Sequence, residues 1–174
     1  MEISDLKTLH RAVWATRREI EDQWPSPPPD DALRFSITEA AEMVDAVLRQ
    51  NMSYKRNHRK QANLEQEVAH CAIMLLTALG EEFDWGQERI ATSWGYWQTS
   101  YQVAVGNGYQ GTGVDWVEGL VSDALQEQLW SQAKQEYWHG EFCIIQALAA
   151  LGDTGVDVMK VVEQELKRME AKHG

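Results

Sequence analysis

The chain has 174 residues, of which 44% are hydrophobic and 25% are charged, a composition typical of a folded globular protein rather than a disordered one. Its formal net charge of −11 argues against a nucleic-acid partner, because phosphate backbones are bound through basic surfaces. No apolar run approaches the roughly 20 residues of a membrane span, and the N-terminus lacks the basic and then apolar layout of a signal peptide. We therefore expect a cytoplasmic protein with no membrane partner.

Apolar residues recur at helical spacing along almost the whole chain, and strand-like alternation is nearly absent. This pattern predicts an all-α fold, an antiparallel helical bundle. The prolines at 25–29 end the first helix, and Asp30 or Asp31 is expected to cap the second. We expect helices at residues 3–22, 31–51, 60–80, 84–104, 115–135, 137–151 and 154–172.

A glycine-rich segment at residues 106–113 interrupts the helical pattern and divides the chain into two halves. We expect residues 1–104 to form a half that carries the acidic motifs, residues 105–114 to form a linker, and residues 115–174 to form a second, degenerate half. The two halves are expected to pack as one domain.

Shifting the sequence against itself by 72 residues places Cys71 on Cys143 and the Ala-Leu-Gly triplet at 78–80 on the triplet at 150–152. One interpretation is a weak internal repeat. The other is chance similarity between two buried helices that both end at glycine. Both interpretations stay open at the level of the sequence.

Glu39 and Glu42 lie in the helix expected at 31–51, on a side that also carries the apolar residues Phe35 and Met43 rather than on the solvent face. Their i,i+3 spacing sets two carboxylates side by side, and their repulsion is costly unless a cation or a proton compensates it. A solvated or salt-bridged pair is the structural alternative.

Glu67 and His70 enter the next helix at the same spacing, just before the fully apolar run at 71–76. Antiparallel packing of the two helices can bring these residues opposite Glu39 and Glu42. A buried cluster of three carboxylates is expensive, and a divalent cation is the usual compensation. For His70 alone, a core histidine bonded to a backbone carbonyl is the competing interpretation.

The motifs Glu39-Ala-Ala-Glu42 and, after 24 intervening residues, Glu67-Val-Ala-His70 resemble the E-x-x-E … E-x-x-D arrangement of the all-α NTP pyrophosphohydrolases. This superfamily includes the MazG-like, dimeric dUTPase-like and dCTP pyrophosphatase-like enzymes. The proline-rich segment at 23–33 is similar in layout to the loop before the first acidic helix of the MazG-like and dCTP pyrophosphatase branches, and the resemblance covers about residues 10–95. It implies a MazG-type helical bundle that binds Mg²⁺ or Mn²⁺ and cleaves a nucleoside triphosphate to a monophosphate and pyrophosphate.

The resemblance implies that Glu39, Glu42 and Glu67 are metal ligands. His70 stands where the family has an aspartate, and we include it as a fourth candidate ligand. Imidazole suits Mn²⁺ better than Mg²⁺, so its presence predicts a preference for Mn²⁺. Glu39 or Glu42 is the candidate catalytic residue, which would orient or deprotonate the attacking water.

The dense basic run at 55–60 is expected to fold over the phosphates, although such runs are commonly solvated helix starts. The phosphate-contacting pair of the family would fall near Thr92 and Tyr96, where Arg89 is the nearest cation. Two tryptophans near the acidic helix could stack on a nucleobase, with core packing as the default role of the others. The candidate substrate-binding residues are therefore Lys55, Arg56, Arg59, Lys60, Arg89, Trp14 and Trp24.

Some chains of this superfamily are similar to a fused pair in which one half has lost its acids. The 72-residue shift fits that arrangement and implies a single-chain pseudo-dimer with one working site. A homodimer of the chain stays open. The alternative function is a catalytically inactive helical interaction protein, or a nucleotide-sensing protein, of the same fold.

Overall fold

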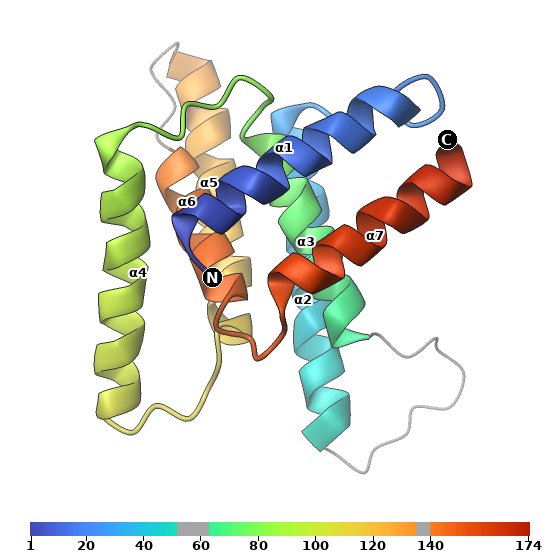
Figure 1. The fold of residues 1–174 in the computed structure, drawn as a ribbon. Coiled ribbons are helices and arrows are strands. Elements are labelled where there is room, and N and C mark those ends of the chain that lie inside the picture. The colour runs from blue at the N-terminus through green and yellow to red at the C-terminus, as the bar shows by residue number, and fades with distance from the viewer. Residues whose placement is uncertain (52–62, 135–139) are drawn as a thin grey trace.

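The computed structural model describes residues 1–51, 63–134 and 140–174. Within these ranges the chain forms helices and no strand, which confirms the predicted all-α class (Figure 1). None of these helices is both long and apolar enough to cross a membrane. The helices are α1 (Ile3–Ile20), α2 (Pro29–Asn51), α3 (Leu64–Ala78), α4 (Glu88–Gly106), α5 (Val114–Lys134), α6 (Gly140–Leu151) and α7 (Val158–His173).

The start of α2 differs from the sequence-based expectation. The helix begins at Pro29, because a proline fits the first turn of a helix, where its missing N–H is not needed. The prediction that Asp30 or Asp31 caps this helix was therefore wrong. Both aspartates lie inside the first turn instead, where each accepts a hydrogen bond of 2.9 Å from Arg34.

Two later helices start a few residues after their expected positions, and an aspartate explains each delay. The carboxylate of Asp84 accepts a hydrogen bond from the N–H of Gly86, which forms a turn before α4 begins at Glu88. Asp157 is the N-cap of α7, and its carboxylate accepts a hydrogen bond from the N–H of Lys160.

Helices α3 and α6 form the centre of the bundle. Helix α3 packs against α1, α2, α6 and α7, and α6 packs against α3, α4 and α5. Figure 1 shows α1 and α7 side by side across one face, with α4 along the outer edge next to α6. Because α3 and α6 are covered on nearly every side, both can be apolar around almost their whole circumference.

The main packed pairs of helices follow a reciprocal pattern. Helix α2 packs on α3 as α5 packs on α6, and α7 packs on α3 as α4 packs on α6. The pairs α2–α5 and α3–α6 join the two sets, and α1 packs on α7 and α3. Exchanging α2 with α5, α3 with α6 and α4 with α7 therefore leaves these pairs unchanged, and α1 alone has no counterpart. Two fused helical halves would pack in this way, while their origin as a repeat stays a prediction.

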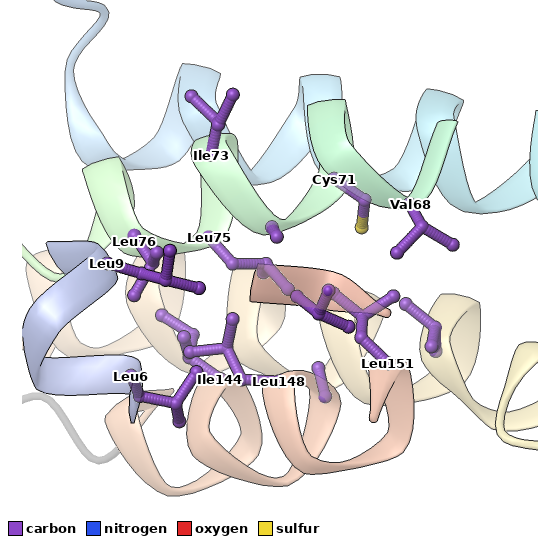
Figure 2. Packing of buried hydrophobic residues seen from close by; sticks show 14 of the residues in the cluster. Leu6, Leu9, Val68, Cys71, Ile73, Leu75, Leu76, Ile144, Leu148 and Leu151 are labelled. Atoms are coloured by element: carbon purple, nitrogen blue, oxygen red, sulfur yellow. The ribbon is translucent and has the colours of Figure 1, made fainter. Parts of the chain in front are cut away.

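The hydrophobic core is continuous through both halves. Figure 2 shows Leu6 and Leu9 of α1, Leu75 of α3 and Ile144 and Leu148 of α6 meeting between the helices, and each is at most 1% exposed. Full burial of a side chain of this size contributes about 1.5–3 kcal/mol. This packing holds α3 in place and thereby fixes the positions of the polar residues in its N-terminal half.

Candidate functional site

The packing of α2 against α3 brings the two acidic motifs together. One ligand atom from each of Glu39, Glu67 and His70 lies within 4.8 Å of the other two. The Nδ1 atom of His70 is 3.5 Å from Oε2 of Glu39 and 3.7 Å from Oε2 of Glu67. We call these three residues the carboxylate–histidine cluster.

Helix α7 supplies a fourth member of this environment that the sequence did not predict. The Nε2 atom of His70 is 3.0 Å from Oε1 of Glu165, across a separation of 95 residues. The other carboxylate oxygen of Glu165 is 3.6 Å from Nη1 of Arg168. No local signal distinguishes Glu165 from an ordinary exposed acid of an amphipathic helix such as Glu163, because its role depends on α7 lying over α3.

The cluster is largely buried, and part of it has no hydrogen-bond partner. The side chains of Glu67, Glu165, Glu39 and His70 are 9%, 12%, 20% and 28% exposed. Within the described residues, Oε2 of Glu39 and Oε2 of Glu67 are buried and accept no hydrogen bond. A buried acceptor without a donor costs about 1–3 kcal/mol, and a charged one costs more. Two such oxygens beside an imidazole nitrogen form a donor set that fits a divalent cation of the Mn²⁺ type.

Protons compensate part of this charge when no cation is bound. The adjacent Glu39 carboxylate raises the pKa of His70 to about 9 in spite of burial, and Glu165 adds to the effect. Burial raises the pKa of Glu67 to about 8, and the neighbouring Glu39 and Glu42 carboxylates raise it further. Burial acts in the same direction on Glu39, but its interactions with the adjacent His70 and Glu67 side chains bring its pKa below the ordinary value. At neutral pH the metal-free cluster therefore holds an imidazolium and a neutral carboxylic acid.

These shifts predict how stability depends on pH without metal. The pKa of Glu67 is about 8 against an ordinary 4.5, and that of His70 is about 9 against 6.5, so the folded chain binds more protons than the unfolded chain between these values. The stability gained from these bound protons is complete when the pH is below the ordinary pKa values of 4.5 and 6.5. It is lost as the pH rises through the folded-state pKa values of about 8 and about 9. We expect thermal melts in EDTA to show the Tm falling by several degrees between about pH 6 and about pH 9.5.

Saturating Mn²⁺ should remove most of this fall in Tm. The bound cation neutralises the clustered carboxylates at high pH, as the bound protons do at lower pH. A Tm that stays level or rises across the same interval in EDTA would show that the cluster does not hold these protons in solution.

A cavity of about 310 Å³ opens beside the cluster. Its volume is within the range of about 300–1,000 Å³ that is typical of small-molecule sites. Glu39, His70 and Glu165 line one part of it, and the rest is apolar and aromatic, with contributions from Trp24, Pro25, Pro27, Phe35, Ile73, Met74 and Met169. The arrangement places a flat apolar surface directly next to a charged group.

The other predicted site residues lie at different distances from this cavity. The expectation that Glu42 lies away from the solvent face was wrong: Glu42 is exposed and stands outside the compact cluster, because it lies nearly one turn beyond the largely buried Glu39 position, although its charge reaches Glu67. Trp24 lines the cavity and is 38% exposed. Trp14 is half-buried on α1 and does not line the cavity.

Arg89 lies away from the cluster. It belongs to α4, which packs on α6 rather than on α3, and its Nη2 atom is 2.7 Å from Glu141. The helix that covers the cluster is α7, and its Arg168 is paired with Glu165. The predicted phosphate-binding residues Lys55, Arg56, Arg59 and Lys60 lie outside the described residues.

The chain was compared with known proteins at three levels. No protein-family model, no curated protein and no solved structure matches it. Membership of the all-α NTP pyrophosphohydrolases therefore stays a prediction from the sequence motifs, and the geometry of the cluster and its cavity carries the argument about function.

Proposed function

We propose that this protein is a divalent-cation-dependent nucleoside triphosphate pyrophosphohydrolase, which converts a ribo- or deoxyribonucleoside triphosphate into the monophosphate and pyrophosphate. The observation that carries the proposal is the pair of buried, partnerless carboxylate oxygens on Glu39 and Glu67, set beside an aromatic cavity. Each buried oxygen without a hydrogen bond lowers the stability of the fold, so a purely structural role does not explain the pair.

Glu39, Glu67 and His70 would hold the cation, with Glu42 close enough to contribute a further oxygen when its side chain turns inward. When bound, a divalent cation supplies positive charge that neutralises the triphosphate and stabilises the charge developing on the departing pyrophosphate. Glu165 holds the imidazole ring of His70 through its Nε2 atom, which leaves Nδ1 directed toward the two glutamates.

Glu42 is the carboxylate best placed to act as the general base. Its side chain is open to solvent and next to Glu67, whereas Glu39 is largely buried beside His70. In the proposed reaction a water oxygen adds to the α-phosphorus, its proton passes to a carboxylate oxygen of Glu42, and the bond from the α-phosphorus to the bridging oxygen breaks. Pyrophosphate leaves with the electron pair of that bond, so no other reactant is required.

The cavity suggests how a nucleotide would lie. Trp24 and Phe35 offer flat apolar surfaces on which a nucleobase can stack. A volume of about 310 Å³ suits a base and sugar, so the triphosphate would extend toward the carboxylate–histidine cluster. Arg168, whose side chain is 62% exposed at the edge of the cluster, would then be available to neutralise a phosphate oxygen.

A second candidate is a nucleotide-sensing or interaction protein without turnover. The observation that favours it is the hydrogen bond between His70 and Glu165, since the imidazolium and the neutral Glu67 balance much of the cluster charge with no cation present. Such a protein would bind a nucleotide in the same cavity without hydrolysing it.

The two candidates are separated by an assay of the purified chain against a panel of ribo- and deoxyribonucleoside triphosphates with Mn²⁺ or Mg²⁺. We expect equimolar monophosphate and pyrophosphate, faster turnover with Mn²⁺, and one Mn²⁺ bound per chain in calorimetric titration, because among the described residues such a cluster occurs in the α2–α3 half alone. Nucleotide binding without pyrophosphate release would favour the sensing protein. A chain that binds neither cation nor nucleotide would exclude both.

A further inference from the structure

A second cavity lies between α4, α5 and α6, and aromatic side chains form most of its wall. Its volume is about 280 Å³, and its lining includes Trp97 and Tyr101 of α4, Trp116 and Leu120 of α5 and Gln146 of α6. We call it the aromatic cavity. No step of the proposed reaction uses it.

The aromatic cavity is the counterpart of the first cavity under the helix exchange described above. Helix α2 lines the first cavity with Phe35 and Glu39, and α5 lines the second with Trp116 and Leu120, at the same spacing of four residues. An aromatic residue occupies the first position of both pairs. Leucine replaces the metal-binding candidate Glu39 at the second position.

The other two helices repeat this correspondence. Helix α7 contributes Glu165 and Met169 to the first cavity, and α4 contributes Trp97 and Tyr101 to the second, again four residues apart. On the central helices, Met74 of α3 corresponds to Gln146 of α6 under the 72-residue shift. The aromatic cavity therefore has the position of a nucleotide cavity without the acids of a metal site.

The aromatic walls are held in fixed orientations. The rings of Trp97 and Tyr101 are stacked with centroids 5.4 Å apart, and the ring of Trp116 meets Trp97 edge-on at 5.8 Å. The indole N–H of Trp97 donates to Asp153 at 2.7 Å, and that of Trp116 donates to the hydroxyl of Tyr109 at 3.0 Å. Because these N–H groups are already bonded, the rings offer their π faces to a ligand rather than their polar edges.

Gln146 gives the cavity a polar group with no internal partner. The residue is 8% exposed and lines the cavity, and its side-chain amide makes no hydrogen bond to any other residue in the described ranges. A side-chain amide can donate two hydrogen bonds and accept two, so Gln146 has donor and acceptor capacity to offer a ligand in the cavity. A planar ligand with ring nitrogens or exocyclic amino and carbonyl groups would satisfy it.

The charges around the aromatic cavity disfavour an anionic ligand. Burial raises the pKa of Tyr101, and the neighbouring carboxylates of Asp153 and Asp115 raise it further. Within the described part of the chain, no lysine or arginine lines the cavity. A phosphate group would therefore be repelled by the nearby carboxylates, with no lysine or arginine in the lining to offset the repulsion. An uncharged heteroaromatic ring would not be repelled.

We propose that the aromatic cavity is a cation-independent binding site for an uncharged nucleoside, separate from the carboxylate–histidine cluster. That a planar heteroaromatic ligand binds here rests on the walls and the free amide of Gln146. That the ligand is a nucleoside rests on the proposed function, through the correspondence between the two cavities.

The test is equilibrium dialysis of the full chain in EDTA against adenosine, guanosine, cytidine and thymidine. We expect at least one of them to bind with a stoichiometry of one per chain. Trp116→Leu should weaken this binding about tenfold or more, since a stacking surface is lost. The control variant Trp130→Leu changes an exposed tryptophan that lines neither cavity and should leave the binding unchanged, and Trp24→Leu tests whether the first cavity is the site instead.

Gln146→Leu is a second variant that removes the amide and keeps the apolar volume. It should reduce the preference among the four nucleosides, and melting curves will verify that each variant is folded. The proposal is overturned if none of the nucleosides binds, or if Trp24→Leu abolishes binding that Trp116→Leu leaves intact. EDTA and the absence of phosphates keep this result independent of pyrophosphate release, so either proposal can fail while the other stands.

Discussion

Glu67→Gln is expected to abolish cation-dependent pyrophosphate release and leave the metal-free protein at least as stable as the wild type. With a pKa raised to about 8 by burial, Glu67 is already a neutral acid at pH 7 without a cation, and glutamine has nearly the same shape as that acid. A bound cation requires the carboxylate form, which glutamine cannot adopt. We expect kcat/KM to fall by about a thousandfold or more, as for the loss of a metal ligand.

Glu65→Gln is the matched control, because Glu65 lies on the same helix two residues away and is exposed. It should retain activity within about twofold of the wild type. Urea unfolding in EDTA should give both variants a free energy of unfolding no lower than that of the wild type. If Glu67→Gln kept turnover within about tenfold of the wild type, the assignment of Glu67 as a cation ligand would be wrong.

His70→Asp is expected to change the choice of cation. Replacing an imidazole by a carboxylate gives Mg²⁺ the oxygen ligand that it prefers, so the ratio of activity with Mn²⁺ to activity with Mg²⁺ should fall about tenfold or more. The substitution also removes the partner of Glu165 and adds another acid to the cluster. The metal-free variant should therefore lose about 2 kcal/mol of stability, as expected when one partner of a buried pair is removed.

The double variant His70→Asp with Glu165→Gln separates these two effects. It offsets one of the two negative charges that His70→Asp adds to the cluster and so should regain part of the lost stability, while keeping the changed ratio of activities. Pyrophosphate release by the wild type and both variants, measured with each cation, tests the prediction. An unchanged ratio in both variants would mean that His70 serves only as a hydrogen-bond partner of Glu165 and not as a ligand.

The helical class and the meeting of the two acidic motifs could be predicted because both depend on local pattern. Periodicity shows which side of α2 and α3 is buried, and two helices adjacent in the chain commonly pack against each other. Glu39, Glu67 and His70 lie together for this reason. The contribution of Glu165 could not be predicted, since periodicity identifies the apolar side of α7 and not the helix that it covers.

The same limit explains Arg89. The family resemblance implies a phosphate-contacting pair near Thr92 and Tyr96 on the helix after α3, and Arg89 is the cation nearest to that position in the sequence. Helix α4 instead packs on α6, and α7 takes the place over α3. A reciprocal exchange of helices between the two halves is a tertiary property, and no local stretch of sequence carries a signal for it.

The hydrogen bond between His70 and Glu165 has a consequence for the order in which the chain folds. Its partners are 95 residues apart, so we expect this contact to form after α2 and α3 have packed together. Until α7 docks, water solvates the acids of these two helices, and docking is the step that removes the water. Helix α7 therefore docks on a charged surface, and we expect its docking rate to depend on whether protons or a cation are already bound there.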